Sequence, residues 1–186
     1  MVISSFYNEE ENTLILATVL GAKQINSKQE KDIIKIYNER DELIGINIFN
    51  YNNMKLKQGI VNNEDIKEEI NKFFGHNWQS PYLIGKIINI KKHPKSEKLN
   101  ICQVDLGMQE VQIVCGASNV KVGIKVIVSQ VGAVMPNGMK IKPSKLLDEE
   151  SNGMITSLFE LGLEKTAGQG IAILDDIYQI GQSYKI

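Results

Sequence analysis

The fold of this chain is decided by the apolar stretch Tyr82-Leu-Ile-Gly-Lys-Ile-Ile-Asn-Ile90 and by the segments that follow it. They are the basic turn Lys91-Lys-His-Pro-Lys-Ser-Glu-Lys98, a hairpin ending in Cys115-Gly-Ala-Ser-Asn119, and the segment Ser151-Asn-Gly-Met-Ile-Thr-Ser157. Short apolar runs bounded by glycine, proline and asparagine predict strands over residues 83–92, 99–105, 109–115, 125–130, 139–142, 153–157 and 171–174. Many short strands at this spacing favour a closed barrel or a sandwich.

A short helix is predicted over residues 158–161, near the end of this all-β pattern. Ser157 and Glu160 have the Ser-x-x-Glu spacing of a capping box, in which each side chain bonds the backbone N–H of the other residue.

The first 80 residues predict a separate α+β domain. Runs of β-branched and aromatic residues indicate strands over residues 2–7, 13–20, 32–37 and 43–49, and polar clusters such as Asn26-Ser-Lys-Gln-Glu30 separate them. A helix is predicted over residues 62–75, with Asn62 or Asn63 as its cap and Gly75 at its end.

The domain boundary is predicted at the segment Asn77-Trp-Gln-Ser-Pro81, because Pro81 restricts Ser80 to an extended conformation. The expected domains are residues 1–80, of unknown role, and residues 81–186.

The net charge of −1 hides an uneven distribution. Residues 81–145 carry ten lysines against Glu97, Asp105 and Glu110, whereas the segments on either side are acidic. One basic segment in a neutral protein indicates a face that binds a polyanion.

Several function classes find no support in the residues. Two cysteines and two histidines without a Cys-x-x-Cys pair do not predict a metal site, and Cys102 and Cys115 alternate with apolar neighbours as buried residues do. No nucleophile elbow or phosphate-binding glycine loop is present, so neither an enzyme nor a cofactor is predicted. Without a signal peptide pattern or a long apolar run, an intracellular protein with no membrane association is expected.

Lysines and aromatics together point to the kind of nucleic acid. Ammonium groups on flexible stems contact phosphate oxygens without reading the sequence. Residues 81–186 hold only Tyr82, Phe159, Tyr178 and Tyr184 as aromatics, none of them beside the lysine-rich turn, so a platform that stacks single-stranded bases is not favoured. The pattern favours recognition of a folded RNA by its shape and phosphates.

Four motifs resemble those of a known family, the tRNA-binding domain found in the N-terminal region of the bacterial phenylalanyl-tRNA synthetase β subunit. They are His93-Pro-Lys-Ser-Glu-Lys-Leu99, Cys115-Gly-Ala-Ser-Asn119, Val131-Gly-Ala-Val-Met-Pro-Asn-Gly138 and Leu147-Asp-Glu-Glu-Ser-Asn-Gly-Met-Ile-Thr-Ser157. The resemblance implies an OB-fold, a five-stranded barrel. Phe6-Tyr-Asn8 and Ile46-Asn-Ile-Phe-Asn50 are similar to the N-terminal domain of the small bacterial tRNA-binding proteins of the YtpR type.

One departure from the family pattern concerns charge. Leu147-Asp148 stands where the family has Arg-Gly, so a cation is lost and an acid appears beside the expected RNA face.

The candidate RNA-binding residues share a place in these motifs or in the basic segment. They are Lys86, Lys91, Lys92, His93, Lys95, Lys98, Asn119, Lys140, Lys142, Lys145, Ser151, Met154 and Ser157. For five of them a structural reading stands beside the RNA contact: His93 as a residue that shapes its turn, Asn119 as a turn residue, Ser151 and Ser157 as local caps, and Met154 as core.

The expected function is that of a cytoplasmic, non-catalytic tRNA-binding protein that recognises folded tRNA through a basic OB-fold face. The alternative is a protein-interaction or assembly factor that uses the OB-fold as a scaffold and residues 1–80 for recognition. The resemblance is also compatible with a homodimer, and a protein partner is expected, if at all, through residues 1–80.

Overall fold

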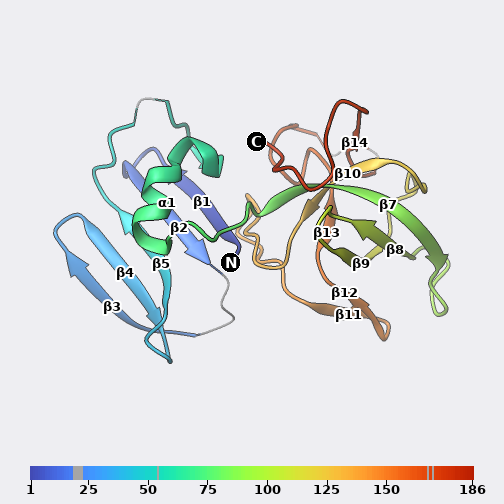
Figure 1. Ribbon diagram of the computed structural model, residues 1–186, viewed down its shortest axis with the longest axis horizontal. Helices are drawn as coiled ribbons and strands as arrows, with labels where there is room; N and C mark the ends of the chain where they lie inside the picture. Colours follow the sequence, from blue (N-terminus) through green and yellow to red (C-terminus); the bar gives the residue numbers. More distant parts are fainter. Residues whose placement is uncertain (19–22, 54, 167, 169) are drawn as a thin grey trace. The chain divides into compact units, whose positions relative to one another are not determined.

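The computed structural model describes residues 1–18, 23–53, 55–166, 168 and 170–186, and β-strands are their main regular secondary structure. They form two compact units, Met1–Ser80 with Ile186 and Pro81–Lys185 (Figure 1). Each unit has its own cluster of buried apolar side chains. No helix among the described residues is long and apolar enough to cross a membrane.

The first unit contains one antiparallel sheet with the strand order β3-β4-β5-β2-β1-β6. Its strands are β1 (Ile3–Asn8), β2 (Thr13–Thr18), β3 (Gln24–Glu30), β4 (Ile33–Asn38), β5 (Leu43–Ile48) and β6 (Gly59–Ile60). Four of the predicted strands are confirmed; the last two residues of the prediction for 13–20 lie outside the described residues.

Strand β3 corrects the prediction that Asn26-Ser-Lys-Gln-Glu30 separates two strands. These polar residues pair with β4 at the edge of the sheet, where most of their side chains are exposed. An edge strand with solvent around its side chains needs no apolar alternation, and charged edges also resist pairing with other chains.

The predicted helix over residues 62–75 is confirmed as a 3₁₀ turn, η1 (Asn63–Ile66), that continues into α1 (Lys67–Phe74). The Asn62 side chain accepts a hydrogen bond from the Glu64 N–H at 3.2 Å, and Gly75, with φ at 73°, ends the helix. Ile66 and Ile70 are buried against Leu14 and other apolar side chains of the sheet.

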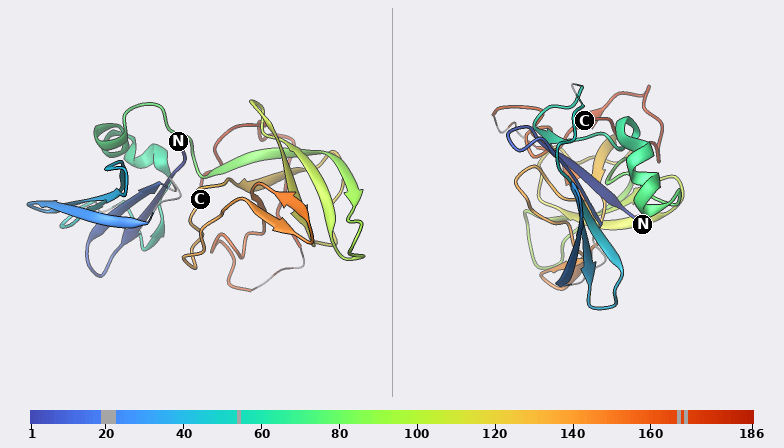
Figure 2. Two further views of the ribbon diagram at one scale, coloured as in Figure 1. Left: turned by 90° about the horizontal axis from the view of Figure 1, so that it is seen from below. Right: turned by 90° about the vertical axis from the view of Figure 1, so that its left-hand side faces the viewer.

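The second unit is built on a curled sheet with the order β13-β10-β7-β8-β9, to which β14 adds beside β10 (Figure 2). Its strands are β7 (Tyr82–Lys92), β8 (Asn100–Asp105), β9 (Glu110–Cys115), β10 (Lys125–Ser129), β13 (Met154–Thr156) and β14 (Ile173–Leu174). The curled half-barrel is consistent with an OB-like domain, and the strands predicted at these places are confirmed.

The long strand β7 explains the curl. Its first half pairs with β10 and its second half with β8, and the register shifts between Ile87 and Asn89. On the inner face a Cβ atom at Gly85 would lie 2.7 Å from Val104 Cγ1, so only glycine allows the two strands to approach this closely.

A two-stranded hairpin, β11 (Ser144–Leu146) and β12 (Glu149–Ser151), was not predicted. Its two-residue turn, Leu147-Asp148, has φ of 48° and 75°, values that hairpin turns normally assign to Asn or Gly. A hairpin is usually recognised in a sequence by alternating apolar residues around an Asn or Gly turn. These charged strands and this turn have neither feature.

Two further predictions for this unit are wrong. Residues 139–142 form no strand; a single bridge joins Val134 and Lys140, although Ile141 is buried between two exposed lysines as the alternation required. Residues 158–161 form a hydrogen-bonded turn instead of a helix, because Leu163 N–H bonds the Leu158 carbonyl and closes the turn.

Candidate nucleic-acid interface

The basic turn (residues 91–98) is fastened to the β11–β12 hairpin by His93. The Lys95 backbone N–H donates to His93 Nδ1 at 3.0 Å, so Nε2 carries the proton and donates to the Leu146 carbonyl at 3.0 Å. The His93 side chain is 4% exposed, and both ring nitrogens are satisfied. Direct contact of this ring with RNA stays a prediction, whereas its role in joining two basic segments follows from these bonds.

An ion pair joins the same two segments at the surface. Lys95 Nζ contacts Asp148 Oδ2 at the tip of the hairpin, and both side chains are more than half exposed. Exposed pairs of this kind contribute about 0–1 kcal/mol, so a phosphate can displace the carboxylate. Asp148 therefore competes with any anion that approaches Lys95.

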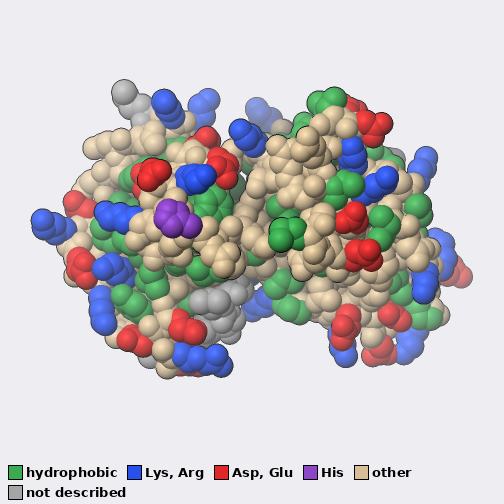
Figure 3. All heavy atoms as spheres, viewed as in Figure 1, with side chains coloured by type: hydrophobic (Ala, Val, Ile, Leu, Met, Phe, Trp, Pro, Cys, Tyr) green, Lys and Arg blue, Asp and Glu red, His purple; other side chains and the backbone are tan. Residues whose placement is uncertain are grey.

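The remaining lysines of the turn, Lys91, Lys92 and Lys98, are exposed and form no ion pair with any described residue. On the hairpin, Lys145 Nζ lies 3.9 Å from Glu150 Oε1, a weak surface pair. Lysines and acids accordingly lie side by side over β11 and β12 (Figure 3).

Lys86 lies apart from this group. It occupies the middle of β7, opposite Lys125 on β10 and Asp105 on β8. The structure thus gathers the basic turn and the hairpin and leaves Lys86 elsewhere on the sheet.

A groove of about 600 Å³ adjoins the hairpin. Lys140, Lys142, Ser151 and Met154, four of the predicted residues, line it. Lys140 and Lys142 are exposed and have no ion-pair partner among the described residues. Met154 is half-buried on β13, so part of its side chain is available to a ligand.

Ser151 and Ser157 have local partners. Ser151 is 3% exposed, and its Oγ accepts from the Val114 N–H at 3.1 Å, which ties β12 to β9. The predicted capping box is present although no helix follows it: Ser157 N–H donates to Glu160 Oε2 at 2.8 Å, and Glu160 N–H donates to Ser157 Oγ at 3.2 Å.

Asn119 holds the C-terminal segment through two hydrogen bonds. Its Nδ2 donates to the Ile171 carbonyl at 2.9 Å, and its Oδ1 accepts from the Ile171 N–H at 3.0 Å. Gly170 passes so close, with φ at 101°, that a Cβ there would lie 2.1 Å from Asn119 Oδ1. The side-chain amide of Asn119 thus makes the pair of hydrogen bonds to Ile171 that a neighbouring β-strand would make. This role is structural.

Replacing Asn119 with Ala is therefore expected to lower stability rather than RNA affinity. Both hydrogen bonds to Ile171 are lost, at a cost of about 2 kcal/mol in the free energy of unfolding, measured by urea denaturation. The control is Asn89→Ala, at an exposed asparagine of β7, with an expected change below about 0.5 kcal/mol. Unchanged stability together with weakened tRNA binding would instead assign Asn119 to the RNA.

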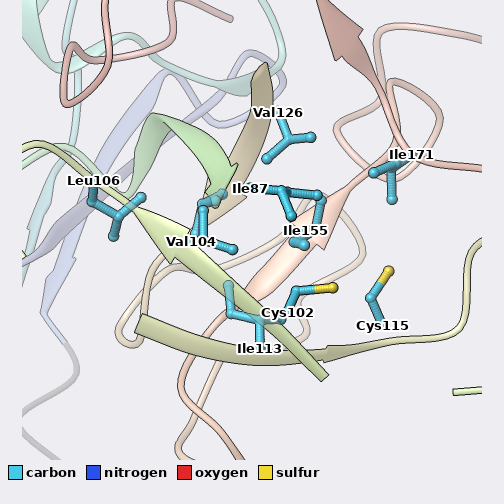
Figure 4. Close-up of a cluster of buried hydrophobic side chains, with 10 residues drawn as sticks. Ile87, Cys102, Val104, Leu106, Ile113, Cys115, Val126, Ile155 and Ile171 are labelled. Atoms are coloured by element: carbon cyan, nitrogen blue, oxygen red, sulfur yellow. The ribbon is translucent and has the colours of Figure 1, made fainter. Parts of the chain in front are cut away.

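The cysteines are buried in the second unit, as predicted. Cys102 and Cys115 point among Ile113, Ile155 and Ile171 (Figure 4). Burial, with a smaller effect of Cys115, raises the pKa of Cys102 to about 12, and burial also raises the pKa of Cys115. Both thiols stay protonated near neutral pH, whereas the thiolate is the form that attacks substrates or binds metal. No group of three or more His, Cys, Asp or Glu side chains among the described residues is placed to hold a metal ion.

Sequence reasoning missed two members of this surface. Glu160 lines the groove together with the lysines, and the Leu146 carbonyl holds His93. The capping-box spacing located Glu160 but assigned it only a local role, and no sequence signal marks a backbone carbonyl.

Comparison with known proteins places this chain among tRNA-binding domains. The family described as "Putative tRNA binding domain" matches residues 83–183. The protein described as "Putative tRNA-binding protein YtpR" from Bacillus subtilis (strain 168) is 34% identical over 200 residues, covering 98% of this chain and 100% of that protein.

Phenylalanine–tRNA ligase beta subunits are more identical to this chain, but over part of the chain and a small part of their own length. The subunit of Sulfurimonas denitrificans is 45% identical over 116 residues, which are 61% of this chain and 15% of the subunit. The subunit of Prochlorococcus marinus (strain MIT 9313) is 53% identical over 97 residues, 51% of this chain and 12% of the subunit.

Proposed function

Since this chain belongs to the "Putative tRNA binding domain" family, we propose that it is a non-catalytic protein that binds folded tRNA through the lysines of its basic turn and of residues 140–145. The proposal treats residues 81–186 as an OB-fold domain and residues 1–80 as a separate α+β domain.

One observation carries the proposal. His93–Leu146 and Lys95–Asp148 connect segments that are 53 residues apart, so the basic turn and the hairpin form one continuous surface. Lysines from two segments can then contact phosphates of the same RNA, and such contacts give affinity without reading bases. The scarcity of aromatic side chains near the turn supports a folded RNA rather than a single strand as the ligand.

A filter-binding titration tests the proposal. Purified protein is titrated with total tRNA and with a single-stranded RNA of equal length, at 50 mM and 200 mM salt. Three to five phosphate contacts predict that the logarithm of tRNA affinity falls with the logarithm of salt at a slope of about −2 to −4. Binding that is indifferent to salt, or equal for the two RNAs, would refute recognition of folded tRNA.

Three further parts of the proposal follow from tRNA as the ligand and from the family resemblance. The protein is expected to work in the cytoplasm, where tRNA is used, and a homodimer would present two basic surfaces to one RNA. A protein partner would bind residues 1–80. Light scattering of the protein alone and of the tRNA complex measures how many copies take part.

A further inference from the structure

The groove beside the hairpin combines an apolar surface with charges of both signs. Ile155 and Ile171, 4% and 8% exposed, belong to the core cluster and reach the groove with the half-buried Leu146 and Met154. The charged residues Lys140, Lys142 and Glu160 also line it. A groove of about 600 Å³ is within the range of small-molecule sites.

The carboxylate has one oxygen available. Glu160 Oε2 accepts from the Ser157 N–H and Oγ, both at 2.8 Å, whereas no described residue donates to Oε1. These two bonds restrain the Glu160 side chain without a ligand. Its charge contributes, after the larger effect of burial, to raising the pKa of Cys115, a residue that also lines the groove.

We propose that this groove holds one unpaired nucleotide whose base carries an exocyclic amino group, with its phosphate at Lys140 and Lys142 and its amino group donating to Glu160. The inference rests on the proposed function in that the nucleotide belongs to the bound tRNA. The apolar side chains of the groove, such as Ile155 and Ile171, can pack against the face of a base. Lysine ammonium groups bind phosphate oxygens.

The carboxylate decides which bases fit. An ionised carboxylate only accepts hydrogen bonds, and it accepts from cytosine N4 but faces a second acceptor in uracil O4. Adenine, guanine and cytosine all present an amino group, whereas uracil does not. Uracil differs from cytosine at C4, where a carbonyl replaces the amino group, and at N3, which carries a hydrogen. The groove is therefore expected to discriminate against uracil through the amino group at C4 that uracil lacks.

Cytidine 5′-monophosphate and uridine 5′-monophosphate are the matched probes. They are titrated to millimolar concentration against the full chain labelled with ¹⁵N, and the amide signals of Gly116, Gly153 and Gly170, which line the groove, are followed. We expect the cytidine nucleotide to bind about tenfold more tightly, because one charge-assisted hydrogen bond is replaced by two opposed acceptors.

Two variants assign the effect to the named side chains. In Glu160→Gln the amide keeps an oxygen for Ser157 and can turn its NH₂ toward uracil, so the preference for cytidine is expected to fall below about twofold. Lys140→Ala/Lys142→Ala is expected to weaken both nucleotides alike. The matched control, Lys121→Ala/Lys165→Ala, removes two exposed lysines that do not line the groove and is expected to change neither.

Binding of tRNA gives an independent readout. Glu160→Gln makes the protein less negative. If net charge alone attracted tRNA, this variant would bind tRNA more tightly. If Glu160 accepts from a base amino group, the variant is expected to bind tRNA severalfold more weakly. Equal affinity for the two nucleotides, or no shift of the glycine amides, would overturn the groove proposal. If the cytidine preference is present and tRNA does not bind, the nucleotide site stands and the proposed function falls.

Discussion

Replacing Lys91, Lys92 and Lys98 with Ala in one variant is expected to lower tRNA affinity by about 10- to 100-fold at 150 mM salt. These three side chains are exposed, and no described residue neutralises them. Each lost phosphate contact reduces the slope of log affinity against log salt by about 0.7 to 0.9, so the slope should become shallower by about 2 to 3. Lys95 is left in place because Asp148 already pairs with it.

The matched control removes the same charge elsewhere. Lys121, Lys165 and Lys185 are exposed residues of the same unit, and none belongs to the basic turn, the hairpin or the groove lining. Their triple replacement with Ala is expected to change affinity less than about threefold, through the long-range field alone. Equal losses in the two variants would mean that net charge, and not the basic turn, attracts the RNA.

Replacing Asp148 with Gly is expected to strengthen tRNA binding by about three- to tenfold and to steepen the salt slope by about 0.7 to 0.9. The variant removes a carboxylate from the tip of the hairpin and releases Lys95 for a phosphate. It also relieves the backbone, because Asp148 has φ at 75°, and glycine adopts this conformation without the Cβ clash. The free energy of unfolding should rise by about 0.5–1 kcal/mol.

Two further substitutions separate charge from backbone. Asp148→Asn removes the charge but keeps a side chain that tolerates positive φ, so it should raise affinity without raising stability. Asp176→Asn removes an exposed acid that lies 3.7 Å from Lys125, away from the turn and the hairpin, and should leave affinity within about twofold of the original. If Asp148→Gly raised stability and left tRNA affinity unchanged, Lys95 would not be a phosphate contact.

Local patterns were enough to predict much of this chain. Short apolar runs bounded by turn residues predicted β7 to β10 within one or two residues. The capping asparagine and Gly75 predicted the helix, and alternation with apolar neighbours predicted the burial of Cys102 and Cys115.

The predictions failed where no local period exists. Strand β3 is polar because it lies at a sheet edge, and the β11–β12 hairpin turns on Leu147-Asp148 without the usual Asn or Gly. At residues 158–161 the capping box was read as the start of a helix, but Gly162, with φ at 72°, follows at once and the chain closes a turn.

Residue patterns alone were enough to find β7 to β10, the excess of lysine in the second unit and the family motifs. The contacts that these motif residues make became visible only in the folded chain. Folding brought His93 to Leu146, Asn119 to Ile171 and Glu160 to the lysine-lined groove. Burial on one face of a strand repeats every second residue and can be read locally. A bond between residues 52 or 53 positions apart depends on how the sheet curls, and it leaves no periodic trace in the chain.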